Sequence, residues 1–143
     1  NRLEMLLEII PSKVGPVDEQ TTARLIHRFY DIGIFPDWWK LEPQSNIAAW
    51  RNIEKAIAAR DPWCRGVVLL GLEAPQNELE AAFAAVADIG VVKGFAIGRT
   101  IFAEAAENWL AGRITDNEAI DDMAARLERL SSAWLRARAG KAA

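Results

Sequence analysis

The stretch Asp37-Trp38-Trp39-Lys40-Leu41-Glu42-Pro43 has the aromatic bias and the closing proline of a β-strand. Side chains alternate between the two faces of a strand, so Lys40 shares a face with Trp38 and Glu42. An ammonium among indoles loses hydration, which favours the uncharged, nucleophilic amine. The stretch therefore predicts Schiff-base chemistry. The alternative is a lysine that extends its methylenes over apolar surface and keeps its charge in water.

Four short apolar runs with strand character recur along the chain, at residues 3–10, 38–41, 66–72 and 91–97. Each run is followed by a segment with the apolar periodicity of a helix. Strands and helices that alternate at a spacing of roughly thirty residues predict a parallel α/β sheet, whose strands are apolar on both faces because helices cover them.

Capping residues, prolines and glycines predict where the helices begin and end. The first helix begins after Asp18 as N-cap and ends at Gly33, and the last helix frays after Trp134. The other predicted boundaries are Ser45 or Asn46 for the second helix, Pro75 in the first turn of the third, Arg99 or Thr100 and Gly112 for the fourth, and Thr115 or Asp116 for the last.

The first run is not followed by a glycine-rich phosphate loop, where an open nucleotide-binding sheet would place one. A barrel is therefore favoured, but a complete barrel needs about 250 residues, and this chain has 143 residues and no initial Met. We expect an α/β fold that is the C-terminal half, strands five to eight, of a (β/α)8 TIM barrel, with four β/α units and a C-terminal helix. The other half is expected upstream. Exposed sheet edges and inward faces predict association with that half or with a second copy.

Composition excludes several classes of function. A net charge of −3 and a pI near 5.2 give no basic surface for nucleic acid, and the arginines near the C-terminus are interpreted as a solvated helix face. Cys64 is the only cysteine, which excludes a disulfide and a cysteine-rich metal site, and the single histidine, His27, lies within a helix. No signal peptide or membrane-spanning stretch is visible, so we expect a cytoplasmic protein without membrane or nucleic-acid partners.

Charged residues and glycines gather where the predicted strands end, which is where parallel barrels place their chemistry. In chain order these residues are Glu8, Lys40, Glu42, Gly71, Gly98 and Arg99. Adjacent strands lie about 4.8 Å apart, so Glu8 can approach Lys40 within one proton transfer. Glu42, two residues and thus about 6.6 Å further along the same face, is the second candidate carboxylate.

Four segments resemble, in order, the last four strands of class I tagatose 1,6-bisphosphate aldolase: Leu6-Leu7-Glu8-Ile9, Trp39-Lys40-Leu41-Glu42-Pro43, the run ending near Gly71, and Gly94-Phe95-Ala96-Ile97-Gly98-Arg99-Thr100. The resemblance is closer to the aldolase-like domain fused behind the sugar kinase 5-dehydro-2-deoxygluconokinase of bacterial myo-inositol catabolism. Segments 37–43, 61–66 and 93–100 carry it. It extends from Leu3 to about Trp134.

The resemblance implies a class I aldolase. By similarity, Lys40 is the Schiff-base lysine on the sixth barrel strand and Glu8 is the proton-shuttling carboxylate on the fifth. Gly71, Gly98 and Arg99 belong to the phosphate site after strands seven and eight, and no metal or cofactor is needed. The implied substrate is 2-deoxy-5-keto-D-gluconate 6-phosphate, cleaved to dihydroxyacetone phosphate and malonate semialdehyde. The implied partner is a fused sugar kinase.

Several alternatives stay open from the residues alone. Glu8 can form a structural ion pair with Lys40 or Arg99, and Lys93 is a second strand lysine that begins its strand and so lies at the opposite rim. A non-catalytic half-barrel that mediates dimerisation or regulation of an attached kinase would keep the same apolar pattern. A metal-dependent aldolase is weakened by the absence of a histidine cluster from the sequence.

Overall fold

The computed structural model describes residues 3–44 and 46–140. Within this part of the chain, four parallel strands form one sheet in the order β1-β2-β3-β4. The strands are β1 (Leu6–Ile9), β2 (Trp38–Leu41), β3 (Gly66–Leu70) and β4 (Val92–Ala96). The predicted mixed α/β class is confirmed, with a parallel sheet in which each strand pairs with the next one along the chain.

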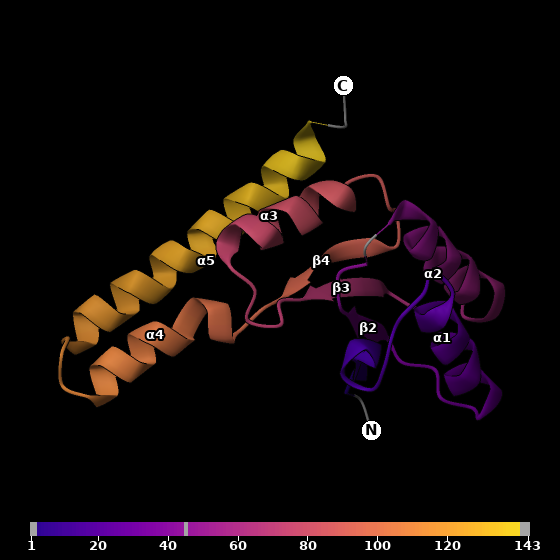
Figure 1. Cartoon of the computed structure of the whole chain (residues 1–143), viewed down its shortest axis with the longest axis horizontal. Helices are drawn as coiled ribbons and strands as arrows, with labels where there is room; N and C mark the ends of the chain where they lie inside the picture. The colour runs from indigo at the N-terminus through magenta and orange to yellow at the C-terminus, as the bar shows by residue number, and fades with distance from the viewer. Residues whose placement is uncertain (1–2, 45, 141–143) are drawn as a thin grey trace.

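Helices connect and follow the strands: α1 (Thr21–Asp31), α2 (Ile47–Arg60), α3 (Gln76–Ala85), α4 (Arg99–Leu110) and α5 (Asp116–Ala139), with the short 3-10 helix η1 (Pro11–Lys13) after β1. Figure 1 shows α1 and α2 side by side, while the long helix α5 runs along both α3 and α4. The helices thus form two groups, α1 with α2, and α5 with α3 and α4.

The hydrophobic core lies between one face of the sheet and the helices. Trp39, Leu41, Val67 and Leu69 are at most 1% exposed and pack with apolar side chains of α1, α2, α3 and α5. The indole Nε1 of Trp39 donates a hydrogen bond of 3.1 Å to the hydroxyl of Tyr30. The buried indole thus keeps its polar atom paired, as a core indole must.

The opposite face of the sheet is more open among the described residues. Leu6 is 48% exposed, and the side chains of Glu8 and Lys40 are 37% and 22% exposed. The general pattern of a parallel sheet predicted helices on both faces of the strands. In this part of the chain the helices cover one face only. The polar side chains stand on the open face, because there they keep contact with water.

Several predicted caps are confirmed. The side chain of Asn46 accepts a hydrogen bond of 2.9 Å from the backbone N–H of Ala49, and Thr115 forms a capping box with Glu118. The alternative cap Ser45 lies outside the described residues. Gly33 and Gly112 follow their helices with φ values of 83° and 66°, a left-handed conformation that glycine adopts without a Cβ clash.

Other predicted boundaries were wrong. β1 begins only at Leu6, because four residues find partners on β2, and α1 begins at Thr21, with Gln20 at the N-cap position. The carboxylate of Asp18 instead accepts bonds from the Gln20 N–H and the Thr21 hydroxyl, which closes a turn before the helix. Pro75 occupies the N-cap position of α3 and not its first turn.

The C-terminal helices also differ from the prediction. The large apolar side chains of α4 are substantially exposed, with Phe102 at 45%, Trp109 at 47% and Leu110 at 77%, although the helix packs against α5 and buries Ala105. Helix α5 does not fray after Trp134. It continues to Ala139, since Arg138 donates to the Ala87 carbonyl at 2.9 Å and lies over the Trp134 ring.

Candidate active site

Lys40 and Glu8 face each other at the centre of the site. Strands β1 and β2 pair in a register that sets Glu8 opposite Lys40, and the Lys40 Nζ lies 2.6 Å from the Glu8 Oε2. The predicted approach of the two side chains is confirmed. At this distance the carboxylate can accept a proton directly from the ammonium.

Lys40 is less enclosed than the sequence predicted. Its side chain is 22% exposed and is ion-paired, where a dry, uncharged amine among indoles was expected. Trp38 turns its indole Nε1 to the carboxylate of Glu4, at 2.8 Å, so this indole is itself hydrogen-bonded on the open face. The difference arises because no layer of the described chain lies over this face of the sheet.

A cavity of about 300 Å³ lies at the C-terminal ends of the strands and contains the Lys40–Glu8 pair. Its lining also includes Gly71, Gly98 and Arg99, which follow β3 and β4. The remaining lining residues are Ile10, Lys13, Leu70, Leu72, Glu73, Ala96, Ile97, Thr100 and Phe102. Five of the six predicted site residues therefore meet in one cavity, because the C-terminal ends of parallel strands share one edge of the sheet.

Gly71 and Gly98 allow close packing of the chain where they line the cavity. A Cβ on Gly71 would lie 3.0 Å from two side-chain carbons of Ile97, and a Cβ on Gly98 would lie 3.0 Å from the ring of Phe102. Such contacts are shorter than ordinary van der Waals contact. Gly71 and Gly98 thus let the chain pass close to its neighbours where β3 and β4 end.

Arg99 is the first residue of α4, and its guanidinium forms an ion pair with Glu73. Glu73 and the preceding Leu72 have φ values of 61° and 50°, in the left-handed region that residues with a side chain rarely adopt. The loop after β3 therefore holds an unfavourable conformation that brings Glu73 to Arg99. Sequence reasoning missed Glu73, because no local signal marks a non-glycine residue that adopts a positive φ.

Glu42 does not join Lys40 in the cavity. Its side chain is 5% exposed, and its two oxygens accept hydrogen bonds from the Ser12 backbone N–H at 3.1 Å and the Ser12 hydroxyl at 2.5 Å. Strand β2 ends at Leu41, so the alternation that placed Glu42 on the face of Lys40 no longer applies. Glu42 holds the loop after β1.

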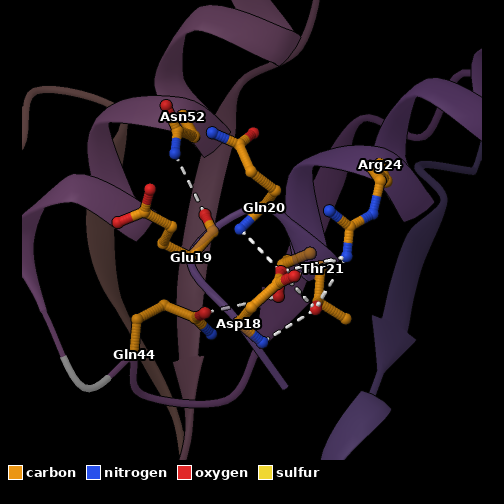
Figure 2. A network of polar contacts seen from close by, with 8 residues as sticks. Asp18, Glu19, Gln20, Thr21, Arg24, Gln44 and Asn52 are labelled. Atoms are coloured by element: carbon orange, nitrogen blue, oxygen red, sulfur yellow. Dashed lines mark hydrogen bonds and ion pairs between the residues drawn. The ribbon is translucent and has the colours of Figure 1, made fainter. Parts of the chain in front are cut away.

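Glu42 lines a second hollow of about 250 Å³, next to a polar network at the start of α1. In this network the Asp18 carboxylate accepts bonds from Gln20, Thr21 and Arg24 (Figure 2). The hydroxyl of Thr21 and the guanidinium of Arg24 hold the pKa of Asp18 down, at about 2. The network links the loop after β1 to α1.

Lys93 lies away from the cavity, as its place at the start of β4 predicted. Its Nζ donates to the Gly90 carbonyl at 2.6 Å. A bulge between β3 and β4 pairs Val67 with Val92 and Val68 with Gly94, so Lys93 has no partner in the ladder. The bulge interrupts the regular alternation of side chains at the start of β4.

Lys13 is a further cavity residue that sequence reasoning missed. It ends the 3-10 helix η1, and its side chain is exposed. The only sequence signal for it is its position in the loop after the first strand, in a barrel that gathers its chemistry on such loops.

Other reactive groups lie elsewhere. Burial raises the pKa of the Cys64 thiol, which keeps the thiol protonated, and burial likewise raises the pKa of Tyr30. Within residues 3–44 and 46–140, no three His, Cys, Asp or Glu side chains gather in a group that could hold a metal ion. A search of the same residues finds no helix with the length and apolar character to cross a membrane.

Comparison with known proteins places the chain in a family. None of the curated proteins matches the sequence. One family model matches residues 1–138, which is nearly the whole chain. The chain therefore belongs to the family described as "Uncharacterized protein conserved in bacteria (DUF2090)".

Proposed function

We propose that this chain is the C-terminal half of a TIM-barrel class I aldolase that cleaves a phosphorylated keto sugar acid. The observation that carries the proposal is the Lys40–Glu8 contact of 2.6 Å within a cavity that also contains Gly71, Gly98 and Arg99. An amine, a carboxylate and an anion-binding helix start are the groups that such a reaction needs.

The strand arrangement supports a barrel. The order β1-β2-β3-β4 has no reversal, whereas a doubly wound sheet reverses its strand order at a switch point. The core packs on one face, and the charged site stands on the other. Four further strands would pair with β1 and β4 and would enclose the face of Lys40, so a preceding half-barrel is the partner that we propose.

The reaction begins with a proton transfer. Glu8 accepts a proton from the Lys40 ammonium, and the free amine adds to the ketone carbon of the substrate to give a carbinolamine. Protonated Glu8 then returns the proton to the carbinolamine hydroxyl, which leaves as water, and the nitrogen lone pair forms the iminium. The proton passes from Lys40 to Glu8 and then to the departing hydroxyl, so Glu8 ends this stage as a carboxylate.

Carbon–carbon cleavage uses the same carboxylate. Glu8 removes the proton from the hydroxyl on the β carbon, the carbon of the breaking bond that is farther from the iminium, and that oxygen forms the aldehyde carbonyl. The electrons of the broken bond pass into the iminium and give an enamine on Lys40. Protonated Glu8 then protonates the enamine carbon, and water hydrolyses the resulting iminium to release the ketone product and restore the Lys40 ammonium.

The phosphate of the substrate is assigned to Gly71, Gly98 and Arg99. Helix α4 begins at Arg99, so its first N–H groups face the cavity end at which Gly98 lies. The planar guanidinium of Arg99 can bind a phosphate through two parallel hydrogen bonds. The loops after barrel strands seven and eight are the usual place of such a phosphate site.

The identity of the substrate rests on the resemblance of the sequence. We propose 2-deoxy-5-keto-D-gluconate 6-phosphate, with dihydroxyacetone phosphate and malonate semialdehyde as products, in cytoplasmic myo-inositol catabolism. A sugar kinase on the same polypeptide is the proposed companion domain. The ketone of this substrate is placed so that a lysine iminium accepts the electrons of the bond that breaks.

Borohydride trapping tests the proposal. The natural full-length polypeptide is incubated with dihydroxyacetone phosphate and sodium borohydride, and the modified peptide is identified by mass spectrometry. We expect an adduct on Lys40 that is absent from Lys40→Arg, while Lys93→Arg, at the other end of the sheet, keeps it. An adduct on Lys93, or no adduct on any lysine, would refute the Schiff-base mechanism.

The second candidate is a non-catalytic half-barrel that assembles with an attached kinase. The Lys40–Glu8 ion pair itself favours it, since a pair that neutralises two charges on a sheet face has a structural use. In this case Lys40→Met would destabilise the protein, and the wild type would form no adduct. The trapping experiment thus separates the two functions.

A further inference from the structure

We propose that Lys13 binds a second anionic group of the ligand, a carboxylate at the end of the molecule opposite the phosphate. The inference rests on the proposed function for the phosphate end of the ligand. It assigns to the same cavity a selectivity for compounds with two acidic ends.

The charges of the cavity support this assignment. Lys13, Lys40 and Arg99 bring three positive charges to the lining, and Glu8 and Glu73 bring two negative ones, which leaves an excess of one positive charge. Lys40 is paired with Glu8 and Arg99 with Glu73. Among the described residues, no hydrogen bond or ion pair engages the Lys13 ammonium, so Lys13 is the cavity cation that a second anionic group can bind without displacing a carboxylate.

Buried residues anchor the loop that carries Lys13. The buried Glu42 carboxylate accepts two hydrogen bonds from Ser12, and Pro11 at the start of η1 is buried. The backbone N–H groups of Lys13 and Val14 close the turn on Ile10 and Pro11. A fixed backbone presents the lysine to the cavity and reduces the entropy that is lost when it binds. Glu42 is therefore a positioning residue for Lys13.

The spacing of the two cations fits a ligand with charges at both ends. Lys13 follows β1 and Arg99 follows β4, three strands away, which corresponds to about 14 Å between strand axes in a flat sheet. Both side chains are long, and both reach the same cavity, with Lys40 on the strand next to β1. A five- or six-carbon chain with a phosphate at Arg99 can thus extend past Lys40 toward Lys13.

Two ligands that lack a ketone test this subsite without Schiff-base chemistry. D-gluconate 6-phosphate has a carboxylate at C1, and D-glucitol 6-phosphate has a hydroxymethyl group there and is otherwise the same. Affinities are measured by calorimetry on the natural full-length polypeptide at low ionic strength, for the wild type, Lys13→Met, Lys13→Arg and Lys55→Met. Lys55 is an exposed lysine on α2 that lies outside the cavity, and it controls for general loss of positive charge.

We expect the wild type to bind D-gluconate 6-phosphate roughly five- to tenfold more tightly than D-glucitol 6-phosphate, the range of a partly exposed charge-assisted hydrogen bond. Lys13→Met should abolish this preference and leave the affinity for D-glucitol 6-phosphate unchanged. Lys13→Arg and Lys55→Met should both keep the preference.

The subsite is refuted if Lys13→Met weakens both ligands equally, if it changes neither, or if the wild type shows no preference or no binding. A different result would refute the proposed function but not the subsite. A carboxylate preference that depends on Lys13, without a borohydride adduct on Lys40, would keep the subsite and remove the aldolase.

Discussion

The Lys40 Nζ lies 2.6 Å from the Glu8 Oε2, across two strands whose register sets these residues opposite each other. The contact joins residues that are 32 positions apart in the chain, and it depends on parallel pairing without any slip. A shift of one residue in this register would turn Glu8 to the other face of the sheet. The contact is therefore a property of the whole sheet.

Glu8→Gln tests the role of the carboxylate as base. The amide keeps the shape of the side chain but cannot accept the proton of Lys40, so we expect adduct formation with dihydroxyacetone phosphate to slow by roughly 10²- to 10⁴-fold. A time course of borohydride trapping, followed by mass spectrometry, measures this rate. Glu107→Gln is the control, because Glu107 is largely exposed on α4. A rate for Glu8→Gln equal to that of the control would exclude Glu8 as the base.

Glu73→Gln tests whether Glu73 competes with an anion for Arg99. Loss of the ion pair frees the guanidinium, so we expect inorganic phosphate to bind roughly two- to fivefold more tightly, in keeping with an exposed pair. Arg99→Gln should remove phosphate binding, and Arg113→Gln, in the loop after α4, should not change it. Chemical-shift titration with phosphate measures all three. Weaker binding by Glu73→Gln would contradict this role.

Ser12→Ala tests the anchor of the loop after β1. The variant leaves the buried Glu42 carboxylate without its shortest hydrogen bond, and we expect the free energy of unfolding in urea to fall by about 1–3 kcal/mol. Ser132→Ala on α5 is the matched control and should change stability by less than about 0.5 kcal/mol. If Ser12→Ala were as stable as this control, Glu42 would not hold the loop.

Gly71→Ala tests the tight contact below the cavity. A methyl group at this position would lie 3.0 Å from two carbons of Ile97, and overpacking of this kind costs about 1–3 kcal/mol of stability. Gly15→Ala is the control, since nothing lies within 4 Å of a Cβ there. Thermal unfolding compares the two. Equal melting temperatures would show that the loop after β3 moves away at no cost.

The lowered pKa of Asp18 predicts that the free energy of unfolding depends on pH in the acidic range. Its pKa is lowered from 3.8 to about 2 by the bonds from Thr21 and Arg24, so its contribution is complete above pH 3.8 and is lost as the pH falls toward 2 (Figure 2). Asp18→Asn should therefore be less stable than the wild type at pH 5, and the gap should narrow by pH 2.5. Urea unfolding at both values measures it. A gap that stays constant would mean that Asp18 does not titrate in this range.

Local patterns predicted much of the fold. The strand at 38–41 and the caps Asn46 and Thr115 lie where the sequence placed them. These features depend on neighbours within a few residues, so propensity, periodicity and capping rules describe them.

The parts that failed depend on distant neighbours. Glu42 was placed beside Lys40 by alternation, but β2 ends one residue earlier and Ser12 binds the carboxylate. The bulge that leaves Lys93 without a partner in the ladder also carries no local signal, since it depends on the pairing of β4 with β3. Lys13 and Glu73 carry no local signal, since their place in the cavity depends on how the loops fold over the sheet edge.

The sequence by itself determined the alternation of four strands with helices, the helix caps and the position of charged residues and glycines at the strand ends, because these follow from short-range sterics and hydrogen bonding. The tertiary structure alone decided which of those residues meet. The register of β1 on β2 brings Glu8 to Lys40, and the loops after β1 and β3 bring Lys13 and Glu73 to the same cavity. Such contacts arise from the packing of the sheet as a whole, which no single segment encodes.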